Sequence, residues 1–195
     1  MSMGRSGSTS DPAGPFGEIK LRPARVDDAE ELAQIHLSTW QVAYRDLLSA
    51  GYLAGLANGV ARRAEVLADA IATEKMSVQV VEQNGQLVAW ASFGSSRDAE
   101  AISTTAELRA INLLPQVWSQ GIGTRLWRHV CQLLINAGYT AATVWVVQGN
   151  DRAIDFYQAA GFVVEPRTHI TVVEQGEPLP LVRYRVVLNS IPDTP

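Results

Sequence analysis

The sequence predicts one α+β domain built on a mixed sheet, and three observations predict it. Strand-like segments alternate with helix-like apolar stripes along most of the chain. The dipeptide Asn84-Gly85 is typical of a tight turn between two hairpin strands. The chain shows neither an internal repeat nor a second apolar core. We therefore expect a single domain over residues 18–190, with an N-terminal tail over 1–17 and a C-terminal tail over 191–195.

Length and composition are ordinary for a globular domain. The 195 residues are 47% hydrophobic and 18% charged, enough to form a sizeable core. A formal net charge of −4 gives no sequence-independent attraction to nucleic acid. No run approaches the ~18 apolar residues that span a membrane, and the first residues lack the apolar segment of a signal peptide. We therefore expect a cytoplasmic protein whose partners include neither nucleic acid nor a membrane.

Cysteine and histidine usage argues against a disulfide and a metal centre. Cys131 is the single cysteine, which rules out an internal disulfide and is typical of a buried thiol in a reducing compartment. The three histidines, His36, His129 and His169, are scattered without a carboxylate or cysteine cluster at ligand spacing. We expect no metal, and we interpret His36 as a packed side chain on a helix.

The N-terminal half predicts helices mixed with strands. A short strand over 18–21 precedes Asp27 and Glu30, which have the spacing of a helix-start capping box before an apolar stripe. Trp40 and Tyr44 share one face of that helix, where they either pack in the core or line a substrate pocket. The further elements are a short helix and loop over 47–57, a helix over 59–72, strands over 77–82 and 86–93, and a polar loop over 94–104.

The C-terminal half opens on a strand, a glycine loop and a helix. Residues 107–114 alternate and then become fully apolar, which predicts a strand. Gly121 and Gly123 follow, and an apolar stripe over 122–137 predicts a helix. Beyond it we expect a buried strand over 140–147, a helix capped by Asn150 or Asp151 and closed by Gly161, and two strands formed by 163–164 with 170–173 and by 181–188.

The glycine loop predicts an anion site, because a strand–loop–helix turn points main-chain N–H groups at a ligand that is usually a phosphate. A dinucleotide fingerprint needs a third glycine where this chain has Leu126. A P-loop needs a Gly-Lys-Ser/Thr tripeptide, which the sequence lacks. The third candidate is the pyrophosphate loop of acyl-coenzyme A transferases. Residues 120–123, Gln-Gly-Ile-Gly, suit it but would also suit a plain tight turn.

A second stretch separates these interpretations. Residues 150–162, Asn-x-x-Ala-x-x-Phe-Tyr-x-x-x-Gly-Phe, together with the glycine loop resemble the GNAT superfamily of acyl-CoA-dependent N-acyltransferases. The resemblance covers about residues 18–188 and includes the opening segment 19–28 and residues 179–184. It implies an α/β three-layer type of α+β fold. Such a fold has a mixed, mostly antiparallel sheet of about six to seven strands, flanked by about four helices and splayed between strands 107–114 and 140–147.

The resemblance also implies a reaction, in which an acetyl group passes from the cosubstrate acetyl-CoA to a primary amine of a small molecule or peptide by direct attack. The pantetheine arm would pair like an added strand with Ile111, Asn112 and Leu113, and an N–H near Leu113 would polarise the thioester carbonyl. Asn150 would cap its helix and contact the cofactor arm. The residues implied to hold the pyrophosphate are Ser119, Gln120, Gly121, Ile122, Gly123 and Thr124.

Two proton transfers in this reaction need side chains. An amine of the lysine type titrates near ~10.4, so it must lose a proton before it attacks. Glu107 is the candidate base, acting through water, and the competing interpretation is a solvated strand-end carboxylate. Some family members carry the base five residues before the motif asparagine, where this chain has Trp145. Tyr157 matches the family's general acid and would bind the cofactor, and the competing interpretation is a buried aromatic.

The acceptor site is expected between the first two helices, the 94–104 loop and the final hairpin, with Trp40, Tyr44, Asp46 and Trp90 as lining residues. Trp118 stands where the family usually has arginine or glutamine, which removes a polar side chain near the phosphates. Two other classes stay open: a coenzyme A-binding regulatory or interaction module that has lost catalysis, and an interaction domain without a cofactor. The resemblance also allows a homodimer through the last strands.

Overall fold

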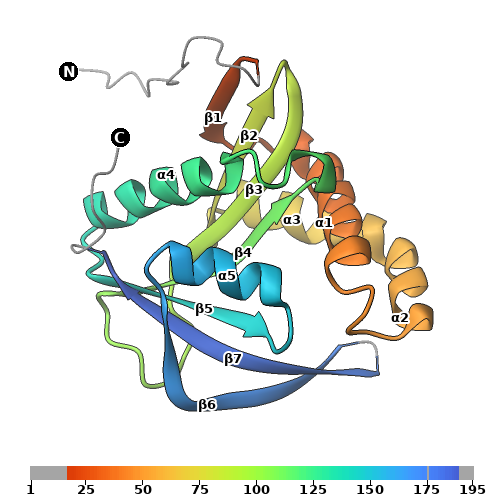
Figure 1. Cartoon of the computed structure of the whole chain (residues 1–195). Helices are drawn as coiled ribbons and strands as arrows, with labels where there is room; N and C mark the ends of the chain where they lie inside the picture. Colours follow the sequence, from red (N-terminus) through yellow and green to blue (C-terminus); the bar gives the residue numbers. More distant parts are fainter. Residues whose placement is uncertain (1–16, 175, 189–195) are drawn as a thin grey trace, which may run out of the picture.

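The computed structural model describes residues 17–174 and 176–188 (Figure 1). Seven strands form its sheet: β1 (Ile19–Pro23), β2 (Ser77–Gln83), β3 (Gln86–Ser95), β4 (Thr105–Leu113), β5 (Ala141–Val147), β6 (Val163–Glu174) and β7 (Glu177–Val187). Their order is β1-β2-β3-β4-β5-β7-β6. Neighbouring strands pair antiparallel except β4 and β5, which are parallel. The predicted mixed, mostly antiparallel α+β sheet is confirmed.

Helices cover both faces of the sheet. The α-helices of the described residues are α1 (Ala29–Ala43), α2 (Ala50–Gly55), α3 (Val60–Ala72), α4 (Ile122–Asn136) and α5 (Asp151–Ala159). In Figure 1, α4 and α5 lie on one face and α1 to α3 on the other. Leu126, Val130 and Phe162 belong to the core on the α4–α5 side. Leu32, Ile35 and Leu67 belong to the core on the α1–α3 side. The arrangement is therefore three-layered, as predicted.

The sheet is splayed at its centre. The parallel pairing of β4 with β5 begins at Thr105 opposite Ala141 and ends at Glu107 opposite Thr143. Beyond that point the two strands diverge (Figure 1). The predicted splay between the two strands is therefore present, and it opens a gap along the second half of β4.

A bulge in β4 lies at the start of this gap. Ser92 of β3 stands opposite Ala110, whereas Phe93 stands opposite Leu108, so Arg109 is an extra residue in β4. A bulge of this kind bends its strand and increases the local twist. The bend therefore coincides with the point where β4 leaves β5.

Local boundaries differ from the prediction at two places. The expected capping box of Asp27 with Glu30 is wrong, because a 3₁₀ turn over Val26–Asp28 precedes α1. The Asp28 carboxylate accepts the Arg25 main-chain N–H at 2.6 Å and two further hydrogen bonds from the Arg22 guanidinium. β6 joins the two expected segments into one strand, with an irregularity between Val164 and His169.

Several bulk predictions can be compared with the described residues. Cys131 is buried and free, and burial raises the pKa of its thiol. No helix of the described residues is both long and apolar enough to cross a membrane. Within residues 17–174 and 176–188, no three His, Cys, Asp or Glu side chains are grouped as metal ligands would be. The predicted tails, apart from Gly17, lie outside the described residues.

Candidate functional site

The glycine loop leads into α4 with its backbone in the left-handed region. Ser119 has φ 61° and Gly121 has φ 78°, and Gly121 is the residue at the helix N-cap. No side chain caps this helix end. The first N–H groups of a helix lack partners within the helix, and they carry the positive end of its dipole. The start of α4 is therefore suited to an anion.

Gly123 is required by close packing at the same place. A Cβ at this position would lie 3.2 Å from Cε2 of Phe156 and 3.5 Å from Cδ2 of Leu113. A larger residue would therefore push α4 away from α5 and β4. The absence of a side chain leaves the main chain of the first turn open to a ligand.

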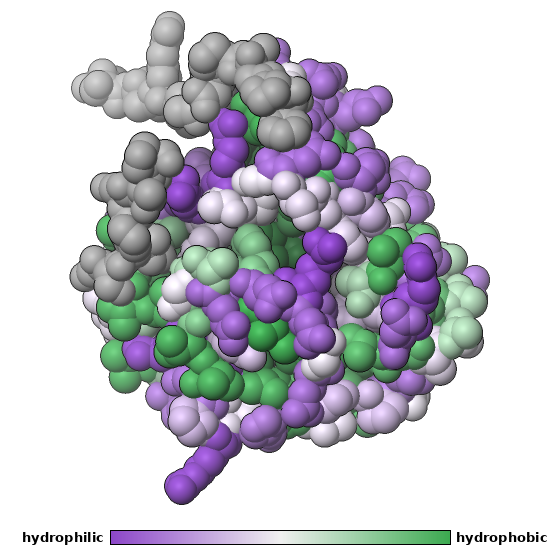
Figure 2. All heavy atoms as spheres, in the orientation of Figure 1, coloured by the Kyte–Doolittle hydropathy of each residue, from purple (hydrophilic) through white to green (hydrophobic). Residues whose placement is uncertain are grey.

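A cleft of about 280 Å³ lies at this junction, and we call it the α4–α5 cleft. Figure 2 shows this face of the molecule, which is hollowed between α4 and α5. Among the predicted cofactor residues, Ile111, Leu113, Ser119, Gly121, Gly123, Thr124 and Asn150 line it. Residues that sequence analysis did not assign to it are Thr39, Ala43, Trp118, Arg152, Ala153 and Phe156.

Four predicted cofactor residues do not line the α4–α5 cleft with their side chains: Gln120, Ile122, Asn112 and Tyr157. The Gln120 amide turns back and donates to the Gln116 carbonyl at 2.8 Å. Ile122 is 1% exposed and belongs to the core. Asn112 lines a different cavity, on the α1 side of the sheet. For Gln120 and Ile122, only the main chain remains as a ligand contact.

The main chain of β4 alternates between its neighbour and the gap. Leu114 donates its N–H to the Val88 carbonyl, so Leu114 and Asn112 face β3. Ile111 and Leu113 then face the gap. The Leu113 carbonyl already accepts hydrogen bonds from the Thr39 hydroxyl at 2.8 Å and from the Trp118 indole at 2.9 Å. The Leu113 N–H is aimed at the same gap.

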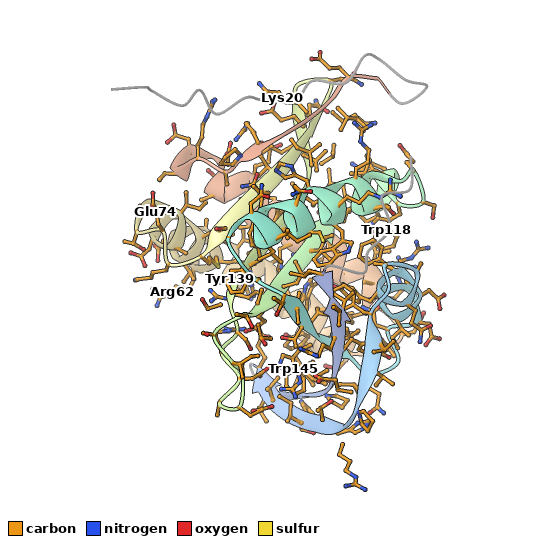
Figure 3. All side chains as sticks on the ribbon, turned by 90° about the vertical axis from the view of Figure 1, so that its left-hand side faces the viewer. Lys20, Arg62, Glu74, Trp118, Tyr139 and Trp145 are labelled. Carbon is orange, nitrogen blue, oxygen red and sulfur yellow. The ribbon has the colours of Figure 1, made fainter. Side chains whose placement is uncertain are left out.

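Trp118 has a clear structural role in the loop. Its indole N–H binds Leu113, and its ring stacks under the Arg152 guanidinium, whose Cζ lies 4.5 Å from the ring centre. Figure 3 places Trp118 between α4 and α5. The positive charge expected from an arginine in the loop is thus supplied by Arg152 of α5. Only the fold brings the two residues together, so the sequence pattern did not reveal this substitution.

Asn150 connects the two sides of the gap. Its side chain accepts the Ala153 N–H at 3.2 Å and caps α5, as one of the two predicted caps. Burial raises the pKa of Tyr44 and outweighs a hydrogen bond with the Asn150 side chain that lowers it. Tyr44 is the C-cap residue of α1 and Asn150 lines the α4–α5 cleft, so this contact bridges opposite faces of the sheet.

A second cavity of about 650 Å³ lies on the α1 side, and we call it the aromatic cavity. The predicted residues Trp40, Tyr44, Trp90, Glu107 and Asn112 line it. Other residues that line it include His36, Arg63, Arg97, Arg109, Trp145 and Glu174. Asp46 is exposed and lines neither cavity, so its expected place in the lining is wrong. Ile111 lines both cavities, which therefore lie next to each other at this residue, within the gap that opens beyond Glu107.

Glu107 is held by a single arginine. Its side chain is 4% exposed, and Arg97 donates Nε at 2.9 Å, Nη2 at 2.5 Å and its main-chain N–H at 3.1 Å to the two carboxylate oxygens. Burial raises the pKa of Glu107, but the hydrogen bonds and charge of Arg97 outweigh it and the net pKa is lowered. The carboxylate is therefore ionised at neutral pH, and it is not a solvated strand-end group.

Tyr157 lies in the core behind both cavities. It is 6% exposed, its ring centre is 5.2 Å from that of Phe156 and 5.4 Å from that of Phe162, and it lines neither cavity. Burial, with a smaller contribution from Tyr44, raises the pKa of Tyr157 far above its usual value. Its hydroxyl is therefore protonated at any physiological pH.

The chain is similar to proteins of a known family. The sequence profile described as "Acetyltransferase (GNAT) family" matches residues 30–162. The chain is 29% identical over 143 residues to YuaI of Bacillus subtilis (strain 168), an uncharacterised N-acetyltransferase, covering 72% of this chain and 78% of that relative.

Two solved structures share the fold. The PaiA N-acetyltransferase from Thermoplasma acidophilum, in complex with coenzyme A, has a TM-score of 0.70 at 18% identity, covering 87% of this chain and 98% of that one. YncA from Salmonella typhimurium, solved with its cofactor acetyl-CoA, has a TM-score of 0.64 at 20% identity, covering 91% and 97%. At these identities the likeness shows a common fold.

Proposed function

The chain belongs to the acetyltransferase (GNAT) family, and we propose that it moves an acetyl group from acetyl-CoA to a primary amine by direct attack in a ternary complex. One observation carries this proposal: the α4–α5 cleft and the aromatic cavity share Ile111, within the gap that opens between β4 and β5. Reacting atoms must approach to about 3–3.5 Å for transfer without an enzyme-bound intermediate. Two chambers that meet at one strand position allow that approach.

The α4–α5 cleft has the features that the phosphates and arm of acetyl-CoA require. The uncapped first turn of α4 offers N–H groups and the positive end of a dipole. Gly123 keeps a place free that a Cβ would fill, and Arg152 adds a cation at the edge. Ile111 turns its main chain to the gap, so the pantetheine arm pairs there, and of Leu113 only the N–H is left for the cofactor because its carbonyl is occupied. Asn112 instead lines the aromatic cavity.

The transfer step balances with two proton movements. Once the ammonium group has lost its first proton, the amine nitrogen bonds to the acetyl carbon, the carbon–sulfur bond breaks, the nitrogen gives up a second proton and the departing sulfur takes one. Negative charge that develops on the carbonyl oxygen is stabilised by the Leu113 N–H, which faces the gap. Donor groups fixed in this way need no rearrangement as the charge appears.

Two side chains are proposed as the general base and the general acid for these proton transfers. Glu107 lines the aromatic cavity in its ionised form, so it takes the amine proton through water, while Arg97 keeps it charged. Tyr157 stays protonated and follows Phe156, a residue of the α4–α5 cleft, so it supplies the proton to sulfur. Tyr44 is a second candidate for the general acid, because it lines the aromatic cavity and its side chain is hydrogen-bonded to that of Asn150.

A coenzyme A-binding module without catalysis is the second candidate. Two observations favour it: the Glu107 carboxylate accepts three hydrogen bonds from Arg97, and Tyr157 lines neither cavity. Such a protein would bind the cofactor and leave the thioester intact.

Acetyl-CoA turnover across a panel of amines tests the proposal, with thiol release as the readout and calorimetry for coenzyme A binding. We expect binding together with thiol release that depends on the added amine, and an acetylated amine of matching mass. Binding without transfer to any amine would support the module. Absence of coenzyme A binding would contradict both candidates.

A further inference from the structure

The charges around the aromatic cavity do not all cancel. Three arginines and three carboxylates line it: Arg63, Arg97, Arg109, Asp98, Glu107 and Glu174. Arg97 pairs with Glu107 at 2.5 Å and Arg63 with Glu174 at 3.4 Å. Asp98 is paired from outside the lining with Arg183 at 3.0 Å, and Arg183 also pairs with Glu100 and Glu165. Arg109 is left as the cation with no carboxylate at ion-pair distance among residues 17–174 and 176–188.

Arg109 is also poorly supplied with hydrogen bonds. Its Nε is buried without a partner, and its Nη2 donates to the Ser95 carbonyl at 3.4 Å, near the limit for a hydrogen bond. The guanidinium lies over Gly94, where a Cβ would be 3.3 Å from Nη2, so it is confined against β3. Burial and the charge of Arg97 lower the pKa of Arg109, more than Glu107 raises it. A partly buried cation in this state is stabilised by an added anion.

His36 gives the cavity a second unfilled polar group. It is 6% exposed, and neither ring nitrogen has a hydrogen-bond partner. Its ring stacks on Trp40 with 4.8 Å between ring centres. Burial, with the nearby charge of Arg63, lowers the pKa of His36 to about 3, so the ring is neutral and offers one donor and one acceptor. An unpaired buried polar group is costly, and a ligand that binds it removes the cost.

The rest of the lining is largely apolar and combines aliphatic side chains with four aromatic rings. Trp40, Tyr44, Trp90 and Trp145 contribute rings from α1, β3 and β5. Two of the indole nitrogens are already occupied, since Trp90 donates to the Leu32 carbonyl and Trp145 to the Asp98 carboxylate. These rings therefore present mainly apolar surface. Figure 3 labels Trp145 on β5, near the loop that carries Asp98.

From these contacts we propose that the acceptor is a small amine that also carries a carboxylate, of the amino-acid type, whose carboxylate binds the Arg109 guanidinium. The apolar body of this acceptor packs between the aromatic rings, and His36 meets a polar atom of it. The proposal rests on the proposed acetyl transfer and specifies its substrate class. A polyamine or a simple alkylamine would instead meet the unpaired positive charge of Arg109.

Matched acceptors test this inference directly. Each of the twenty common amino acids is compared with its carboxamide and its decarboxylated amine, and diamines are added, all at saturating acetyl-CoA. For the best acceptor we expect kcat/KM to exceed that of its amide by about 10- to 100-fold, as for a charged hydrogen-bond pair. Equal or faster turnover of amides, decarboxylated amines or diamines would overturn the proposal and leave acetyl transfer intact. Failure of every amine would instead remove the proposed function itself.

Substitutions at Arg109 locate the carboxylate. In Arg109→Gln the preference for the acid over its amide should disappear, because kcat/KM for the acid falls more than kcat/KM for the amide. Arg109→Lys should restore part of the preference, because it keeps the charge without the planar fork. Arg62→Gln is the matched control, since Arg62 is exposed on α3 and lines neither cavity (Figure 3). An unchanged preference in a folded Arg109→Gln protein would contradict the assignment.

Discussion

The α4–α5 cleft and the aromatic cavity lie on two sides of one strand, but they are built in different ways. Most of the cleft comes from two short segments, 118–124 and 150–156, and it presents small residues and the helix N-terminus. The aromatic cavity collects large charged and aromatic side chains from α1, α3 and five strands. A cofactor of fixed chemistry can be held by backbone, whereas an acceptor is selected by side chains. The two regions should therefore respond differently to substitution.

The largest expected effect concerns the proposed general acid, Tyr157, in the core. Tyr157→Phe should lower kcat by about 100-fold or more, the usual contribution of a positioned acid, at unchanged affinity for coenzyme A. Tyr44→Phe is the matched control, because it removes a second nearby phenol. Steady-state kinetics with calorimetry measures both. Full activity of Tyr157→Phe, with a large loss in Tyr44→Phe, would transfer the acid role to Tyr44.

The next effect should be confined to the α4–α5 cleft. Gly123→Val places methyl groups against Phe156 and Leu113, so we expect coenzyme A to bind about 10- to 100-fold more weakly, the equivalent of ordinary overpacking. Gly51→Val is the control, since nothing lies within 4 Å of a Cβ at Gly51. Calorimetric titration gives the affinities, and thermal unfolding shows that both variants fold. Equal affinity for coenzyme A in the two variants would contradict a role for Gly123 in binding coenzyme A.

A third effect concerns stability in the aromatic cavity. In the folded chain the pKa of His36 is lowered to about 3, whereas in the unfolded chain it lies near its ordinary value of about 6.5. As the pH falls below about 6.5, the unfolded chain therefore binds a proton at His36 that the folded chain does not bind. Stability should therefore rise with pH through this window. Between pH 7 and pH 5, the free energy of unfolding of His36→Phe should fall by about 2 kcal/mol less than that of the original chain, as measured by urea unfolding. Parallel losses would contradict a buried neutral His36, since His129 titrates alike in both proteins.

The smallest expected effect is a shift in the pH dependence of kcat/KM when Arg97 is replaced. Arg97 holds the pKa of Glu107 below its usual value, whereas burial alone would raise it. In Arg97→Gln the acid limb of the kcat/KM profile should thus move to higher pH, with little change on the alkaline side. Glu107→Gln should abolish this limb together with most of the activity. An active Glu107→Gln protein would remove Glu107 as the base.

The contrast between the two regions also explains what the sequence could predict. The elements of the α4–α5 cleft follow local patterns, because glycines, caps and apolar periodicity act within a few residues of one another. Gly121, Gly123 and Asn150 were found in this way. The aromatic cavity depends on side chains far apart in the chain, such as Arg63 with Glu174. No local pattern marks such pairs, so Arg109 and His36 were not assigned to the site and Asp46 was assigned wrongly.

The most direct measurement is a crystal structure of the chain with coenzyme A. We predict the pyrophosphate at the N–H groups of the first turn of α4, and the sulfur in the gap between β4 and β5, beside Ile111. The sulfur would then face the aromatic cavity, where the amine is proposed to bind. A pyrophosphate bound elsewhere, or a sulfur that ends outside the gap, would contradict the central claim that the two cavities meet to form one active site.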